Sequence, residues 1–183
     1  MFNITKTKTT YPVTLSEVKT HLRVDTNNFE DDDYIENYII KSATRFCENF
    51  IDKDIALTTN TYTVYDFGSS NLRIDEGNLV SITDVSINGT LNTSYELYKE
   101  NNQFTLEWEN FLGGGEDPDY TLTTHFTTGY DGITNICPED IKQAIFIVCG
   151  NLYDNERSSY SFSSVKKSDV VERILGPYRA IRW

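Results

Sequence analysis

The chain has 183 residues, of which 38% are hydrophobic and 13% aromatic, and its formal net charge is −12. This length is enough for one domain, or for a domain with a sizeable insertion, and the apolar content excludes global disorder. The excess of acidic side chains argues against general binding to nucleic-acid phosphates, which requires clustered Lys and Arg. It permits an acidic surface that repels DNA.

The three cysteines predict buried, reduced thiols and no metal site. Cys47, Cys137 and Cys149 lie far apart in the sequence, and they form neither a CxxC motif nor a cluster with metal-ligand spacing. The chain also shows no signal peptide at its start and no apolar run near the ~20 residues that a membrane span needs. We therefore expect synthesis in the cytoplasm, no membrane association and no metal.

The first expected elements are an arm and a short capped helix. Residues 1–11 are rich in Thr and Lys without periodicity, so an extended arm is expected. The sequence Thr14-Leu-Ser-Glu17 is a capping box, in which the Thr14 hydroxyl accepts from a backbone N–H and Glu17 reaches back to the cap. The apolar residues that follow at helical spacing predict a helix over about 14–23.

An acidic loop follows this helix. Its acidic residues are Asp25, Glu30, Asp31, Asp32 and Asp33. An EF-hand loop would need oxygen ligands at alternate positions and a Gly at the turn, but Phe29 stands at a ligand position and Glu30 at the turn. We prefer a solvated loop whose acids cap the next helix to a calcium site.

Two longer helices are expected over 33–50 and 138–153. The first has one apolar stripe, formed by Ile35, Tyr38, Ile39, Ala43, Phe46 and Phe50. The second is apolar over most of its circumference, with a face of Ile141, Ala144, Ile145, Val148 and Leu152 that Phe146, Ile147 and Cys149 widen. Such a helix must be buried by several neighbours or by a partner chain, so we place it at the centre of a small bundle.

Between residues 55 and 128, β-branched and aromatic residues alternate with polar ones in short runs divided by turn signals. Asn88-Gly89 predicts a type I′ hairpin turn after a strand over 79–87, and a second hairpin is expected around residues 100–102. The triple glycine at 113–115 is followed by Glu116 rather than by Gly-Lys-Ser/Thr, which argues against a phosphate loop.

These patterns predict an α+β fold, with a small helical bundle (helices near 14–23, 33–50, 138–153 and 169–175) and an antiparallel β-unit inserted at about 55–128. Residues 1–54 and 129–183 would form the helical domain with its terminal arms. Gly176-Pro177 would end the last helix, and the chain closes on a basic, aromatic segment. The side chains of this segment that suit a partner interface are Tyr178, Arg179, Arg182 and Trp183.

No catalytic constellation is visible. The two histidines, His21 and His125, fall in different predicted units, and neither has a neighbouring nucleophile or ligand cluster. We therefore expect no catalytic residue, no cofactor and no enzymatic activity.

The order of motifs resembles the tailed-phage head–tail connector (adaptor) proteins in their longer form. The stretch from Tyr11 to Asp25 follows the family's opening, Pro-x-Thr-x-x-Glu-x-Lys-x-x-Leu-Arg-x-Asp, before an acidic loop and a long helix. Residues 128–130, 138–145 and 152–157 are similar to its second half, and residues 174–179 match its closing Leu-x-Pro-Tyr-Arg. The resemblance is weakest across 55–127, where only the β pattern is shared.

This resemblance implies a structural virion protein of the neck between capsid and tail. Relatives assemble as a ring, usually dodecameric, beneath the portal, extend the channel through which DNA passes without sequence-specific binding, and present a surface to the next tail or stopper protein. On this basis Tyr178, Arg179, Arg182 and Trp183 would contact the portal protein. Asp31, Asp32 and Asp33 would face the channel or a seam between subunits, although a solvated outer loop explains them equally well.

The alternative is a β-rich receptor- or carbohydrate-binding module of a phage tail. Such a module would use exposed aromatic side chains of the β-unit, for which Tyr62, Tyr98 and Trp108 are the candidates. It leaves the helical part and the basic terminal segment without a role.

Overall fold

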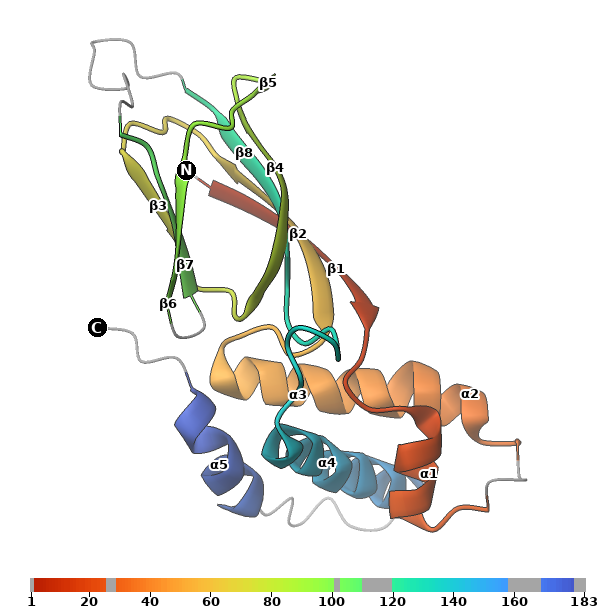
Figure 1. Cartoon of the computed structure of the whole chain (residues 1–183). Coiled ribbons are helices and arrows are strands. Elements are labelled where there is room, and N and C mark those ends of the chain that lie inside the picture. Colours follow the sequence, from red (N-terminus) through yellow and green to blue (C-terminus); the bar gives the residue numbers. More distant parts are fainter. Residues whose placement is uncertain (1, 26–28, 101–102, 110–119, 158–168, 180–183) are drawn as a thin grey trace. The chain divides into compact units, whose positions relative to one another are not determined.

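A computed structural model describes residues 2–25, 29–100, 103–109, 120–157 and 169–179 (Figure 1). The chain combines helices with antiparallel sheets, so the predicted α+β class is confirmed. It forms two compact units. The β-unit comprises residues 1–10 and 56–135, and the helical unit comprises residues 11–55 and 136–183.

The helices of the helical unit begin and end within a few residues of the predicted bounds. They are α1 (Leu15–Leu22), a continuous helix made of α2 (Asp32–Tyr34), the π-helical segment η1 (Ile35–Ile40) and α3 (Lys41–Ile51), then α4 (Glu139–Arg157) and α5 (Asp169–Leu175), followed by the 3₁₀ turn η2 (Gly176–Tyr178). Helix α4 contacts α1, η1, α3 and α5. Its side chains Ile141, Ala144 and Ile145 are fully buried, as expected for a helix that is apolar over most of its circumference.

The capping box at the start of α1 is confirmed. The backbone N–H of Glu17 donates to the Thr14 hydroxyl at 3.3 Å, and the Thr14 N–H donates to the Glu17 carboxylate at 2.7 Å. This backbone hydrogen bond is the main cause that lowers the pKa of Glu17. The helix ends at Arg23, which adopts a left-handed conformation with φ 56°.

The π-helical segment shifts the buried face of the second helix by one residue. Its i→i+5 spacing accommodates one more residue than a regular α-helical turn. As a result the buried hydrophobic side chains after Ile35 are Ile39, Ile40, Ala43, Cys47 and Ile51. The predicted apolar stripe is therefore wrong at two positions: Tyr38 is 65% exposed and Phe46 is 52% exposed.

The β-unit consists of two antiparallel sheets. One has the strand order β1 (Phe2–Thr10), β2 (Leu57–Val64), β8 (Leu122–Thr128), β4 (Leu79–Ile87) and β5 (Thr90–Leu91). The other has the order β3 (Asn71–Ile74), β7 (Gln103–Glu107) and β6 (Glu96–Glu100). Side chains from both sheets share the core: Phe104 of β7 meets Phe126 of β8 edge-to-face, with 5.2 Å between the ring centroids.

The two hairpins of the β-unit are confirmed, whereas the N-terminal arm is not. Asn88 and Gly89 both have positive φ, as a type I′ turn requires, and they join β4 to β5. The β6–β7 hairpin pairs Glu100 with Gln103. Residues 2–10, assigned to the helical domain from the sequence, instead form β1 along β2, from Phe2 opposite Val64 to Thr10 opposite Leu57. Strand β3 was not expected at all.

The segment after β8 also belongs to the β-unit rather than to the helical domain. The Asp131 carboxylate accepts three backbone hydrogen bonds, from Asn135, Thr134 and Ile133 at 2.7, 2.9 and 3.0 Å. These bonds, with Asn135 the strongest contributor, lower the pKa of Asp131. One carboxylate thus fixes the turn that ends the β-unit.

Candidate functional site

The aromatic side chains proposed for a sugar-binding module are only partly available. Trp108 is 4% exposed, packs edge-to-face on Phe67 at 5.6 Å and donates from its indole Nε1 to Asn92 Oδ1 at 3.1 Å. It is a core residue, so it is not available to the alternative binding module. Tyr62 stacks on Phe2 with ring centroids 5.7 Å apart, and Tyr98 remains 48% exposed.

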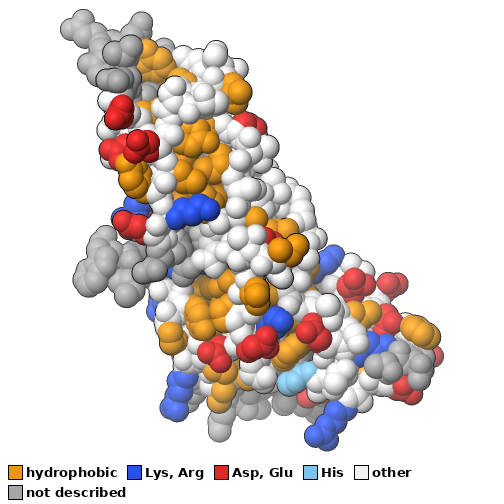
Figure 2. All heavy atoms as spheres, in the orientation of Figure 1, with side chains coloured by type: hydrophobic (Ala, Val, Ile, Leu, Met, Phe, Trp, Pro, Cys, Tyr) orange, Lys and Arg blue, Asp and Glu red, His pale blue; other side chains and the backbone are white. Residues whose placement is uncertain are grey.

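The β-unit does expose apolar surface elsewhere. Hydrophobic side chains are gathered on the face that lies between β6 and β4 in the orientation of Figure 1, as Figure 2 shows. Leu91 of β5 and Leu97 of β6 are exposed hydrophobic residues of the β-unit. Apolar side chains gathered on one face mark a contact surface more often than scattered ones do.

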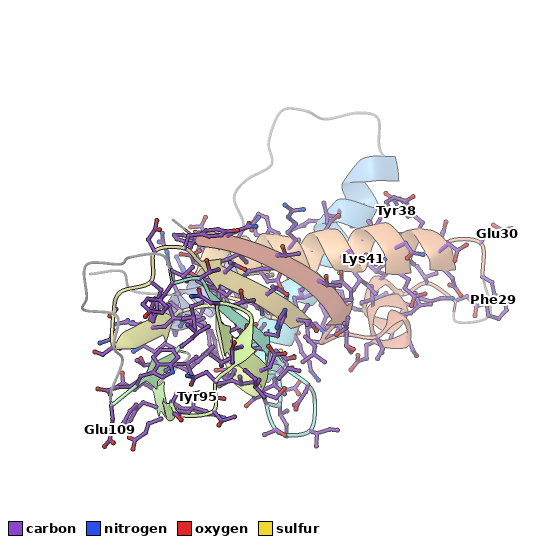
Figure 3. The ribbon with its side chains drawn as sticks, turned by 90° about the horizontal axis from the view of Figure 1, so that it is seen from above. Phe29, Glu30, Tyr38, Lys41, Tyr95 and Glu109 are labelled. Carbon is purple, nitrogen blue, oxygen red and sulfur yellow. The ribbon has the colours of Figure 1, made fainter. Side chains whose placement is uncertain are left out.

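A second apolar surface lies on the helical unit, and sequence reasoning had placed it in the core. Tyr38 stacks on Tyr34 with ring centroids 5.9 Å apart, and Phe46 lies two turns further along the same helix. Lys41 and Arg45 are exposed beside them. Figure 3 shows Tyr38 and Lys41 along this helix, with Phe29 and Glu30 in the loop before it. The exposure of Tyr38 and Phe46 could have been predicted only by recognising the π-helical turn in the sequence.

The C-terminal candidates divide between described and undescribed residues. Helix α5 buries Val171 and Leu175 and contacts α3 and α4. The Tyr178 hydroxyl donates to Asp140 Oδ2 at 3.4 Å, and burial, followed by the charge of Asp140, raises the pKa of Tyr178. The Arg179 guanidinium lies 5.8 Å from the centroid of the Phe50 ring.

These contacts anchor the start of the terminal segment on the helical unit. The Tyr178 side chain is partly buried and Arg179 is exposed. The other two candidates, Arg182 and Trp183, lie outside the described residues.

The acidic candidates Asp31, Asp32 and Asp33 have unequal roles. Asp31 accepts a hydrogen bond from the Tyr153 hydroxyl of α4 at 2.8 Å. Asp32 forms an ion pair with Lys19 of α1, with 2.6 Å between Nζ and Oδ1, and the Lys19 side chain is almost fully buried. Two of the three acids therefore hold the start of the long helix against its neighbours, while Asp33 is exposed.

The cysteines and histidines serve packing and pairing. All three cysteines are buried free thiols, as expected, and burial raises the pKa of each to about 12. His21 stacks on Phe146 of α4 with 5.4 Å between centroids, and His125 Nδ1 lies 2.8 Å from Asp84 Oδ1.

Within the described ranges, no three His, Cys, Asp or Glu side chains gather in a way that could hold a metal ion. Among the helices described, none is both long and apolar enough to span a membrane.

Comparison with known proteins identifies the family. The model of the phage gp6-like head-tail connector proteins matches residues 12–104, just over half of the chain. The chain belongs to this family, and its function is that of a structural head–tail connector of a phage-like particle. No curated protein matches the chain.

Solved structures extend the fold match to nearly the whole chain. One similar chain comes from the neck of an empty gene transfer agent (GTA) particle with C6 symmetry: the TM-score is 0.73 and the identity 15%, covering 98% of this chain and 97% of that one. A chain of the virion of a native GTA particle gives 0.71 at 15% identity, with 97% and 96% covered. A chain of the neck of a native GTA particle with C12 symmetry gives 0.66 at 13% identity, with 98% and 97% covered.

Proposed function

We propose that the chain assembles as a ring of twelve copies beneath the portal, in the neck of a virion. The observation that carries this proposal is the near-complete fold match to neck chains of particles described with C6 and C12 symmetry. A match over both units, rather than over one, supports the same role for the whole chain. The ring would extend the DNA channel and present a surface to the next tail or stopper protein.

The proposed architecture is a small helical bundle around α4, with a β-unit that is mostly inserted between α3 and α4 and receives β1 from the N-terminal segment. The contacts of α4 with α1, η1, α3 and α5 support this arrangement. The role is structural and non-enzymatic, and DNA would pass through without sequence-specific binding. The net charge of −12 supports passage without adhesion, because an acidic wall repels phosphates.

The terminal segment is the proposed portal contact, through Tyr178, Arg179, Arg182 and Trp183. The contacts of Tyr178 with Asp140 and of Arg179 with Phe50 support this, because they fix where the segment leaves the helical unit. For the acidic group, only the exposed Asp33 suits the channel or a subunit seam, because Asp31 and Asp32 already bind neighbouring helices.

Particle assembly without the chain tests the connector role. Cells that lack it should accumulate DNA-filled heads and free tails, and supplying the chain should restore tailed particles. Complementation with a chain that lacks residues 176–183 should fail although the protein folds, whereas removal of the exposed Arg45 side chain (Arg45→Ala) serves as a matched control. Normal tailed particles without the chain would refute the connector role, and normal particles with the truncated chain would refute the portal contact.

A further inference from the structure

The two sheets of the β-unit end in four edge strands, β1 and β5 in one sheet and β3 and β6 in the other, of which β1 and β6 are the longest. In the described part of the chain, β1 pairs only with β2, and β6 pairs only with β7. An open edge presents backbone N–H and C=O groups that can pair with a strand of another chain, and proteins normally protect or use such edges. Strand β1 has nine residues, and all five residues of β6 are exposed.

These edges lie on opposite sides of the unit. Lys6 of β1 forms an ion pair with Glu76, which follows β3, so β3 is on the β1 side of the smaller sheet. Strand β6, at the other edge of that sheet, follows β5 after a short connection held to β4 by the hydrogen bond from Asn92 N to Val85 O at 2.8 Å. Figure 3 agrees, because β1 and Tyr95, the residue before β6, lie on opposite sides of the β-unit.

The side chains of the two edges are complementary in charge. The β1 face that lies over Tyr62 and Asn60 of β2 carries apolar and basic residues, namely Phe2, Ile4, Lys6 and Lys8. The outward face of β6 carries acidic and aromatic residues, namely Glu96, Tyr98 and Glu100. On the acidic side, Glu96 stands directly opposite Glu107, a like-charge pair that is unfavourable unless a cationic group approaches.

Both edges also adjoin exposed apolar surface. Phe2 is exposed on β1, Leu97 is exposed on β6, and Figure 2 shows hydrophobic side chains between β6 and β4. Each edge thus combines unpaired backbone groups, charged side chains and nearby apolar surface. This combination suits pairing with a strand of another protein better than exposure to solvent. The occupant that the chain itself supplies is the opposite edge of a second copy.

We infer that β1 of one copy pairs with β6 of the next copy, with the face of Lys6 and Lys8 against the face of Glu96 and Glu100. This inference rests on the proposed ring. A contact between two different surfaces on opposite sides of a subunit is heterologous, and it closes into a ring when the rotation between copies allows it. Continuous strand pairing would give each seam both backbone hydrogen bonds and ion pairs.

Cysteine cross-linking on assembled rings tests the pairing. If the basic face of β1 meets the acidic face of β6, then Thr5 and Thr7 of β1 share the other face with Lys99 of β6. Of the double variants Thr5→Cys/Lys99→Cys and Thr7→Cys/Lys99→Cys, at least one should give a ladder of disulfide-linked oligomers. The same threonine variants combined with Tyr98→Cys should not, because Tyr98 points to the opposite face. The native cysteines do not compete, because they are buried with thiol pKa values of about 12.

A charge exchange tests the same seam without a covalent bond. Lys8→Glu and Glu100→Lys should each weaken ring assembly on a purified portal by about tenfold, and the double exchange should recover most of the loss. Lys6 is left unchanged because its reversal would also break the ion pair with Glu76 inside the subunit. Arg45→Glu, an exposed charge reversal on the helical unit, is the matched control, and circular dichroism confirms that each variant folds.

The outcomes separate this inference from the ring itself. Cross-links with two-residue periodicity and recovery in the double exchange support the β1–β6 seam. Rings that assemble normally but show neither result overturn the seam and leave the ring standing. Failure of the unmodified chain to assemble on the portal overturns the proposed function, and the seam with it.

Discussion

The shifted face of the second helix predicts opposite effects for two neighbouring substitutions. Ile39 is 1% exposed and Tyr38 is 65% exposed, although a regular helical stripe would bury both. Ile39→Ala removes buried methylene and methyl groups and should lower the free energy of unfolding by about 2–5 kcal/mol. At roughly 2–4 °C per kcal/mol for a chain of this length, the melting temperature of the chain should fall by about 4–20 °C.

Tyr38→Ala should have a small effect by the same reasoning. It removes a solvent-exposed ring and its stacking on Tyr34, a contact between residues four apart on a helix surface that contributes about 0.2–0.5 kcal/mol. Phe46→Ala, at 52% exposure, is the matched second control. Urea denaturation followed by helical circular dichroism at 222 nm measures all three. Equal losses for Tyr38→Ala and Ile39→Ala would refute the shifted register.

Three further predictions concern stability and reactivity. Because the pKa of each thiol is raised to about 12, none of the three cysteines should react with a disulfide reagent at pH 8 until urea unfolds the chain, and fast reaction of any one in the folded chain would contradict its burial. Thr14→Ala should lower the free energy of unfolding by about 1 kcal/mol, because the helix cap is lost. The folded-state pKa of Glu17 is lowered, so the stability that the cap contributes should be present at pH 7 and lost as the pH falls through that pKa. An effect of Thr14→Ala on the free energy of unfolding that is unchanged at low pH would argue against the capping box. Trp108→Ala should cost about 3–5 kcal/mol by emptying the core beside Phe67, measured as a lower denaturation midpoint of the β-unit, and a near-neutral result would mean that the ring is exposed.

Features that depend on local chemistry could be predicted from the sequence. The Thr14–Glu17 capping box and the Asn88-Gly89 turn need only residues that are adjacent in the chain, and both have the expected geometry. Helix α4 could be placed at the centre because a helix that is apolar over most of its circumference must be buried by several neighbours. The order of motifs also pointed to the connector family, which the family match confirms.

Features that depend on tertiary context could not be predicted in the same way. Strand β1 lies at a sheet edge and is mostly exposed, so its Thr- and Lys-rich sequence lacks the apolar alternation that marks a strand. The π-helical turn has no sequence signature, yet it moves Tyr38 and Phe46 out of the core. Trp108 was offered as a binding residue because composition alone does not show that Asn92 satisfies its indole N–H in the core.

The candidate site shows the same division. The sequence singled out Tyr178 and Arg179, and the structure places both against the helical unit, at Asp140 and Phe50. The sequence alone could not show that Asp32 pairs with Lys19 of α1, because that contact depends on how two helices pack. The strand edges proposed for the ring seam follow from sheet order, which no local pattern determines.

The most direct test of the connector role is co-sedimentation of the folded chain with its purified portal ring, with the bound stoichiometry measured. We predict saturable binding at a ring-like ratio, about twelve chains per portal for the ring proposed above. A monomeric state of the chain alone does not affect this test, because a template can drive assembly of weakly associating copies. Absence of binding at low salt by a demonstrably folded chain would contradict the account.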